Sequence, residues 1–139
     1  MLVHYAKCCN PIPGDSIVGF ITRGRGVTVH MSECKKAFEF DQMRKVEVEW
    51  NVTEAGPGQE RVVRVQVLST DAPGLLKQMS EAFAVYSVNI HNASVRTTRD
   101  KKAVAYFDAE VRNTNQLNLV LLQLQKIKGV IGVTRVSSL

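Results

Sequence analysis

The sequence predicts an α+β protein in which a small β-β-α-β domain precedes a larger β-α-β-β-α-β domain. Apolar residues alternate with polar ones in several short stretches, and apolar residues at helical spacing lie between those stretches. The polar segment "TEAGPGQE" at 53–60 separates two such series, and its glycines and proline are typical of a linker. We therefore place the first domain at 1–54, the linker at 55–60 and the second domain at 61–139.

The first domain is expected to contain three strands and one helix. The strands are "SIVGFIT", "GVTVHM" and "RKVEVEW", and the helix is "SECKKAFEF", with Ser32 as its N-cap. A unit of this size is near the lower limit for a stable core. We therefore expect it to need a metal ion, its neighbouring domain or another chain to be well ordered.

The second domain has clearer periodicity. It begins with the strand "RVVRVQVLS", followed by a helix over "DAPGLLKQMSEAFAVYS" in which Pro73 suits the first turn. Two strands follow, "VNIHNASVRT" and "AVAYFDAEV", and the first changes parity near Asn92, which indicates a bulge. A helix over "NTNQLNLVLLQLQKIKG" and the strand "VIGVTRVS" complete the domain. The predicted order is the ferredoxin-like split βαβ arrangement, with both helices on one face of an antiparallel sheet.

Helical spacing also predicts which side chains of this domain are buried. The expected core positions of the two helices are Leu75, Leu76, Met79, Phe83 and Tyr86, and then Leu117, Val120, Leu121, Leu124 and Ile127. Leu119 and Leu122 lie on the opposite face of the second helix. These two leucines could form a partner surface or be scattered surface residues, which are common.

Composition and charge exclude several classes of protein. The chain has 139 residues, of which 45% are hydrophobic, and no apolar run approaches the ~20 residues that cross a bilayer. Three cysteines, two of them adjacent, favour reduced thiols and a cytoplasmic location over a secreted disulfide framework. The net charge of +5 suits nucleic acid, but a basic surface without such a partner explains it equally well.

Four residues of the first domain have the number and chemistry of zinc ligands, namely Cys8, Cys9, His30 and Cys34. Cys34 falls in the first turn of the expected helix, where the thiol pKa is lowered. Cys8 and Cys9 are adjacent, so both reach one ion only across a sharp bend. Three interpretations remain open: a zinc site, a cysteine packed as a small hydrophobe while His30 simply ends a strand, and a redox-responsive module.

Basic residues suggest contacts with RNA. "TRGRGV" is expected to be a hairpin loop whose arginines face solvent or meet phosphates. RNA-recognition domains share the β-α-β-β-α-β order, but this sequence lacks their paired outward aromatic residues, so any contact would be to the phosphate backbone. The candidate RNA contacts are Arg23, Arg25, Arg64, Arg96, Arg99, Lys101 and Lys102.

The stretch "YAKCCNPIPGDSIVGFITRGRGVTVHMSEC" resembles the RIS or zinc-finger-like domain of the RelA/SpoT family, bacterial enzymes that make and often hydrolyse (p)ppGpp. "DAPGLLKQMSEAFAVYSVNI" is similar to the signature of the ACT domain, and the predicted element order is the ACT fold. The resemblance covers essentially the whole chain. The paired cysteines of the family map onto Cys8 and Cys9, its histidine onto His30, and its acidic-Cys pair onto Glu33 and Cys34, where we expect aspartate instead of glutamate.

The resemblance implies a regulatory region that couples amino-acid starvation to (p)ppGpp synthesis and hydrolysis. The sequence itself has no "HD" hydrolase motif and no phosphate-binding glycine loop, so we assign no catalytic residue. The implied partners are the catalytic domains of the parent enzyme, ribosomal RNA with uncharged tRNA, and a second copy bound through the ACT domain. A module that docks on RNA without any small ligand is the alternative.

ACT domains typically pair and hold small ligands, often amino acids, between protomers. Here free amides at the start of the first helix could accept a carboxylate, and Asp71 could meet an ammonium group. Apolar neighbours favour a branched-chain amino acid, although the same residues also make a good turn without any ligand. The expected ligand contacts are Asp71, Ala72, Gly74, Leu75, Leu76, Asn89 and Ile90.

Overall fold

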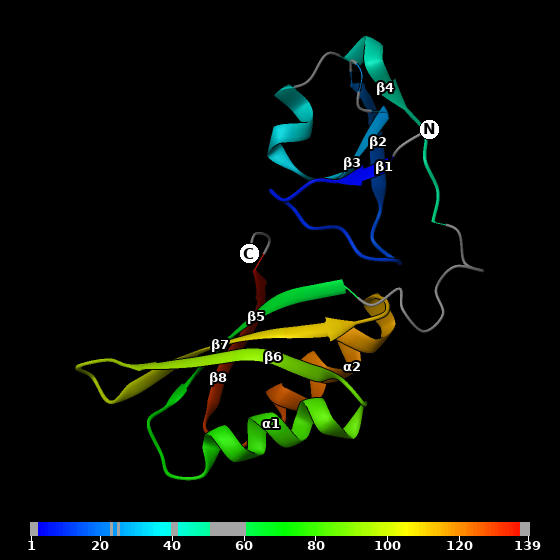
Figure 1. Ribbon diagram of the computed structural model, residues 1–139. Coiled ribbons are helices and arrows are strands. Elements are labelled where there is room, and N and C mark those ends of the chain that lie inside the picture. Colours follow the sequence, from blue (N-terminus) through cyan, green and yellow to red (C-terminus); the bar gives the residue numbers. More distant parts are fainter. Residues whose placement is uncertain (1–2, 23, 25, 40–41, 51–60, 137–139) are drawn as a thin grey trace.

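A computed structural model describes residues 3–22, 24, 26–39, 42–50 and 61–136. These residues form two four-stranded sheets, one at each end of the molecule (Figure 1). The expected fold class, a small α+β unit followed by a ferredoxin-like β-α-β-β-α-β unit, is confirmed. None of the helices in the described part of the chain is long and apolar enough to cross a bilayer. The expected linker at 55–60 lies outside the described residues.

The small sheet has the order β1-β3-β2-β4. The expected strands β2 (Ile17–Thr22) and β3 (Gly26–Met31) pair in antiparallel fashion. The prediction missed β1 (Val3–Tyr5), which runs parallel to β3, because its three residues are all exposed and show no alternation. Of the third expected strand, only Lys45–Val46 forms a strand, β4. After β4 the chain returns to the loop at 10–15, where the Trp50 indole donates to the Asp15 carbonyl at 2.9 Å.

The expected helix in this domain is wrong in type and length. Two short 3-10 helices, η1 (Lys35–Glu39) and η2 (Gln42–Arg44), lie in its place. The amide of Cys34 donates to the Met31 carbonyl at 3.0 Å, so the first residues of the expected helix form a turn at the end of β3 instead. Ser32 lies in that turn and is not the N-cap that we expected.

The large sheet has the order β6-β7-β5-β8, and every pair is antiparallel. The strand register shifts between Ile90 and Asn92, which confirms the expected bulge, and a second shift between Leu68 and Ser69 was not predicted. The elements of this domain are β5 (Arg61–Thr70), α1 (Leu75–Val85), β6 (Asn89–Thr97), β7 (Lys102–Val111), α2 (Thr114–Gln125) and β8 (Val130–Val136).

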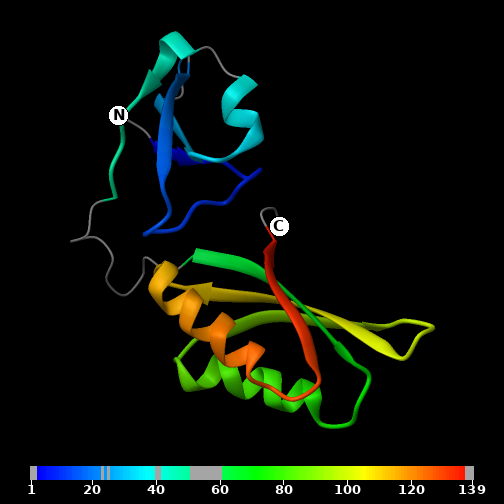
Figure 2. The same ribbon diagram turned by 180° about the vertical axis from the view of Figure 1, so that it is seen from behind.

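Both helices cover one face of the large sheet, as Figure 1 and the reverse view in Figure 2 show. The core lies between them and the sheet, with Phe83 of α1 against Phe107 of β7 at a centroid distance of 5.0 Å. Leu76 was expected in this core but is 47% exposed, because α1 begins at Leu75 and turns the next side chain toward its flank. Leu119 and Leu122 lie on the solvent face of α2 as expected, 45% and 55% exposed.

The loop at 10–15 belongs to the small domain but packs against the large one. Ile12 is fully buried and belongs to the core of the large domain, although it comes from the small one. The Pro13 carbonyl accepts the amide of Thr114 at 2.8 Å, and Arg135 of β8 makes an ion pair with Asp15. No pattern in the sequence indicated this contact between the domains.

Candidate functional site

The Cys/His cluster consists of Cys8, Cys9, His30 and Cys34, all in the small domain. Cys8 and Cys9 lie in a turn after β1, His30 lies in β3, and Cys34 follows the turn at the end of β3. The turn is the sharp bend that the adjacent cysteines require. The Asn10 amide donates to the Ala6 carbonyl at 2.9 Å, and Asn10 itself has a positive φ of 46°.

The four ligand atoms lie within 4.8 Å of one another. The Sγ of Cys8 is 3.5 Å from the His30 Nδ1, 3.5 Å from the Cys34 Sγ and 3.9 Å from the Cys9 Sγ, and the Cys9 Sγ is 3.8 Å from the same nitrogen. A tetrahedral zinc ion with ordinary bond lengths would place two sulfur ligands about 3.8 Å apart and sulfur and nitrogen about 3.6 Å apart. The donor set and its spacing therefore fit a metal ion of this kind.

Burial is the largest effect on the protonation of this cluster. It raises the pKa of Cys9 to about 12, raises the pKa of Cys8 and lowers the pKa of His30, which keeps the imidazole neutral. Burial also acts to raise the pKa of Cys34, but hydrogen bonds to its sulfur from Cys8 and from the backbone outweigh this effect and lower that pKa. Metal binds the neutral imidazole and the thiolate, so His30 and Cys34 are close to their binding forms, whereas an ion would have to displace the protons of Cys8 and Cys9.

The large domain has a pocket of about 180 Å³ at the start of α1. Five of the expected ligand contacts line it, namely Asp71, Ala72, Gly74, Leu75 and Leu76. Its other walls come from the sheet and from α1, chiefly Met79, Val95, Ala103 and Ala105. Gly74 has φ of 82°, a left-handed conformation that favours glycine, so the backbone turns sharply into the helix beside the pocket.

Asn89 and Ile90 do not lie at this pocket. Asn89 pairs with Glu110, whereas Thr70, next to the pocket, pairs with Lys102. Glu110 and Lys102 are eight residues apart along β7, or about 27 Å in an extended strand. A ligand in the pocket of one chain therefore cannot meet Asn89 of the same chain.

The expected RNA contacts divide into three groups. Arg23 and Arg25 lie outside the described residues. Arg64 lies on the open face of the sheet and is held by Asp108, with N–O distances of 2.7 Å and 3.0 Å. The remaining four lie at the hairpin between β6 and β7, which projects beyond the helices in Figure 1, and are Arg96, Arg99, Lys101 and Lys102.

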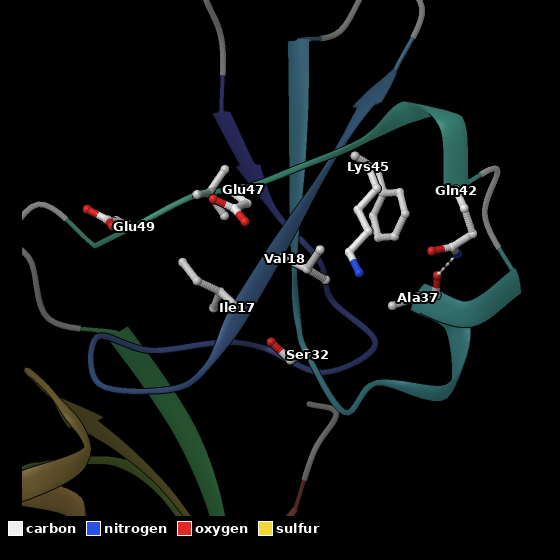
Figure 3. Close-up of a pocket in the computed structure, with 10 residues that line it drawn as sticks. Ile17, Val18, Ser32, Ala37, Gln42, Lys45, Glu47 and Glu49 are labelled. Atoms are coloured by element: carbon white, nitrogen blue, oxygen red, sulfur yellow. Dashed lines mark hydrogen bonds between the residues drawn. The ribbon is translucent and has the colours of Figure 1, made fainter.

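A second pocket, of about 400 Å³, lies in the small domain and was not predicted (Figure 3). Val18 and Ile17 form part of an apolar floor, and Lys45, Glu47 and Glu49 lie along the β4 side. Its lining residues come from β2, the turn after β3, the 3-10 helices, β4 and the segment after it, which have no shared periodicity in the sequence. For this reason the sequence could not indicate it.

Family models match both domains. Residues 1–51 match the RelA/SpoT RIS domain, and residues 57–135, more than half of the chain, match the ACT domain. The chain belongs to the ACT domain family, with a RelA/SpoT RIS domain before the ACT domain. The Cys/His cluster is thus in the RIS domain, and the pocket at the start of α1 is in the ACT domain.

Relatives with similar sequences align with nearly all of this chain over a small part of their own length. The chain is 42% identical over 136 residues to a GTP pyrophosphokinase from Myxococcus xanthus, and it is 39% identical over 140 residues to the bifunctional (p)ppGpp synthase/hydrolase RelA of Mycobacterium tuberculosis. These matches cover 98% and 99% of this chain but only 18% and 19% of the relatives. The chain therefore spans less than a fifth of the length of these proteins.

Solved structures support the ACT fold. The solution structure of the ACT domain from a GTP pyrophosphokinase of Chlorobium tepidum aligns with 58% of this chain and 91% of that chain, with a TM-score of 0.51 and 22% identity. The crystal structure of the same domain gives a TM-score of 0.50 and 21% identity over 55% of this chain and 99% of that chain. At this level of identity, the likeness concerns the fold.

Proposed function

We propose that this chain is a regulatory region of a (p)ppGpp synthetase/hydrolase and that its ACT domain senses amino-acid supply. The region would do no catalysis and would act on the catalytic domains of the parent enzyme. Support comes from the relatives, which are named GTP pyrophosphokinase and (p)ppGpp synthase/hydrolase. The observation that carries the sensing proposal is the ACT pocket, which combines a carboxylate, a helix start and an apolar floor.

The pocket has complementary groups for a free apolar amino acid. The start of α1 offers backbone amides to a carboxylate, and Asp71 at the rim offers a negative charge to an ammonium group. Met79, Val95 and Ala105 provide an apolar surface for a side chain, which favours a branched-chain amino acid.

A second copy would complete the ligand site. Among the described residues, β6 is an edge strand of the ACT sheet, so its outer side could pair with another strand. Asn89 and Ile90 lie on this strand but far from the pocket of their own chain. We infer that they would serve the pocket of a partner chain in an ACT homodimer.

Calorimetric titration with each branched-chain amino acid tests the sensing proposal. We expect saturable binding that is lost in Asp71→Ala, because the ammonium group would lose its partner. Asp100→Ala is the matched control, since Asp100 is an exposed carboxylate on the β6–β7 hairpin and outside the pocket. Absence of heat for all three amino acids at millimolar concentration would contradict the proposal and leave the ACT domain as a docking module.

We further propose that the RIS domain holds a zinc ion at Cys8, Cys9, His30 and Cys34. Four protein ligands would close the coordination shell, which is typical of structural zinc rather than catalytic zinc. Such an ion would supply folding stability that this small domain lacks on its own. Elemental analysis of the purified protein should give about one zinc per chain, and a variant with Cys8 and Cys34 both replaced by serine should hold none.

A second candidate function is contact with ribosomal RNA and uncharged tRNA. The clustering of Arg96, Arg99, Lys101 and Lys102 at one projecting hairpin favours it, because such residues neutralise phosphates. We expect RNA affinity to fall steeply as salt rises, with a slope reduced by about 1 for each basic residue replaced by glutamine. Lys77→Gln on α1 is the control, and an unchanged slope in a variant with all four replaced would exclude the hairpin.

A further inference from the structure

The loop at 10–15 follows the Cys/His cluster directly and packs on the ACT domain before the chain returns to β2. It begins at the residue after Cys9, and its apolar centre is Ile12, which is fully buried in the ACT core. The Pro13 carbonyl accepts the Thr114 amide at 2.8 Å, which occupies an amide that α2 leaves free at its N-terminus. The 10–15 loop therefore links the proposed metal site of the RIS domain to the ACT domain that carries the proposed amino-acid site.

An ion pair fixes the far end of this loop. The guanidinium of Arg135 in β8 donates to both carboxylate oxygens of Asp15 at 3.0 Å, and its Nη2 also donates to the Asn10 carbonyl at 2.9 Å. The second oxygen of Asp15 accepts the Ile12 amide at 2.8 Å. The side chains of Arg135 and Asp15 are only 18% and 8% exposed, so this bidentate pair holds the loop more strictly than a surface ion pair would.

The near end of the loop is fixed to the cluster. Cys9 is buried, and its sulfur accepts the Met31 amide at 3.3 Å. Asn10 follows at once, and its side-chain amide donates to the Val62 carbonyl in β5 at 2.7 Å. In the described segment 8–15, the residues that contact the ACT domain follow the cluster directly, without a spacer between them.

We propose that Asp15 and Arg135 are positioning residues for the Cys/His cluster, and that metal binding there and docking of the 10–15 loop on the ACT domain are coupled. The inference rests on the proposed metal site. If the metal favours the docked loop by some factor, an undocked loop must weaken metal binding by the same factor. A signal at either domain would then reach the other through six residues.

The first test measures zinc affinity in point variants of the protein. Competition with a chromophoric chelator should show at least about fivefold weaker binding in Asp15→Asn, the lower range for coupled sites. Arg135→Lys keeps the charge but loses the two-pronged contact, so its affinity should fall between those of Asp15→Asn and the wild type. Asp100→Asn is the control, because that carboxylate lies on the distant hairpin. Wild-type zinc affinity in a folded Asp15→Asn chain would overturn the proposal.

Hydrogen exchange at two neighbouring amides is the second test. The Thr114 amide reports docking, whereas the Gln116 amide donates to Asn113 Oδ1 within the ACT domain and serves as an internal control. Removing zinc should speed exchange at Thr114 by about fivefold or more and leave Gln116 unchanged. Unchanged exchange at Thr114 would overturn the coupling.

The two proposals can fail separately. If the purified protein holds no zinc, the metal site is wrong, and Cys9→Ala then tests the coupling alone. This variant removes the buried sulfur beneath the Met31 amide, so it should speed exchange at Thr114 even without metal. If it leaves that exchange unchanged, the cluster does not communicate with the ACT domain.

Discussion

At the scale of single residues, position 14 leaves the least room for a side chain. It has φ of 103°, and a Cβ built there would lie 2.0 Å from the Oγ1 of Thr114 in the ACT domain. Gly14 therefore meets two requirements that only glycine satisfies, a left-handed backbone and a very close approach to another domain. The Pro13-Gly14 pair indicated a turn, but no pattern in the sequence indicated that Thr114 would lie beside it.

Gly14→Ala should destabilise the protein more than a substitution that only strains the backbone. We expect a loss of about 2–4 kcal/mol, from the left-handed conformation together with the overlap. Gly24→Ala is the matched control, because Gly24 has φ of 69° and no described atom within 4 Å of the added carbon, so about 1 kcal/mol is expected. Urea unfolding measures both, and equal losses would show that the contact with Thr114 is unimportant.

The residues of the Cys/His cluster could be named from the sequence, but their geometry could not. Donor chemistry alone indicated Cys8, Cys9, His30 and Cys34. The convergence of the two adjacent cysteines depends on the bend at Asn10, and a positive φ at asparagine cannot be predicted from one sequence. One interpretation of the sequence was that His30 simply ends a strand. In the structure, its Nδ1 also lies beside the sulfurs of Cys8 and Cys9.

At the scale of elements, the long strands and helices were predictable and the short ones were not. β5 and β7 each have ten residues, in which buried and more exposed positions alternate along all of β7 and along β5 from Val62 onward. α2 shows three buried residues at helical spacing. The 3-10 helices and β4 are two to five residues long, too short for any period to appear. The separation of Asn89 from Asp71 follows from the antiparallel order itself, because β6 begins at Asn89, at the end of the sheet opposite the hairpin, and runs toward the hairpin end where the pocket lies.

The pairing of β5 with β7 should weaken at acid pH. Hydrogen bonds from Arg64 are the largest effect on Asp108, and they outweigh burial and hold its pKa below the ordinary value. A carboxyl with a lower pKa in the folded state contributes stability above about pH 4 and loses that contribution as pH falls through the folded pKa. Asp108→Asn should therefore cost a few tenths of a kcal/mol at neutral pH, since solvent screens the pair, and the deficit should shrink as pH falls below about 4.

Urea unfolding at several pH values between 3 and 7 checks this. Glu81→Gln on the exposed side of α1 is the control variant. A deficit in Asp108→Asn that is the same at every pH would mean that packing, and not the ion pair, explains it.

At the scale of the whole molecule, the RIS domain keeps its own buried cluster of Val18, Phe20 and Ala37 but also contributes Ile12 to the core of the ACT domain. Tyr5 and Trp50 of the RIS domain stack at 5.5 Å, and the Arg61 guanidinium of the ACT domain lies 4.1 Å from the Tyr5 ring. Together with Ile12 in the ACT core, this contact predicts that the domains unfold together. The sequence could not predict it, because a single apolar residue between two prolines has no period.

Ile12→Ala should destabilise the ACT domain, although residue 12 belongs to the RIS domain. A fully buried isoleucine leaves a cavity when truncated, at a cost of about 2–5 kcal/mol. Ile131→Ala, at a position that is 54% exposed, should cost far less. The melting temperature of ACT-domain resonances, measured by NMR for both variants, shows which substitution destabilises that domain. Unchanged ACT melting in Ile12→Ala would contradict the packing of Ile12 in the ACT core.

The buried position of Ile12 has a practical consequence for anyone who divides this chain into fragments. Composition changes at 53–60, so that stretch is the obvious place to start a shorter ACT fragment. A fragment that starts at Arg61 would lack the side chain that fills its own core, and it would expose an apolar hollow to water. Such a truncation is expected to aggregate more readily than the intact protein, and joining residues 10–15 to it through an added linker is the natural remedy.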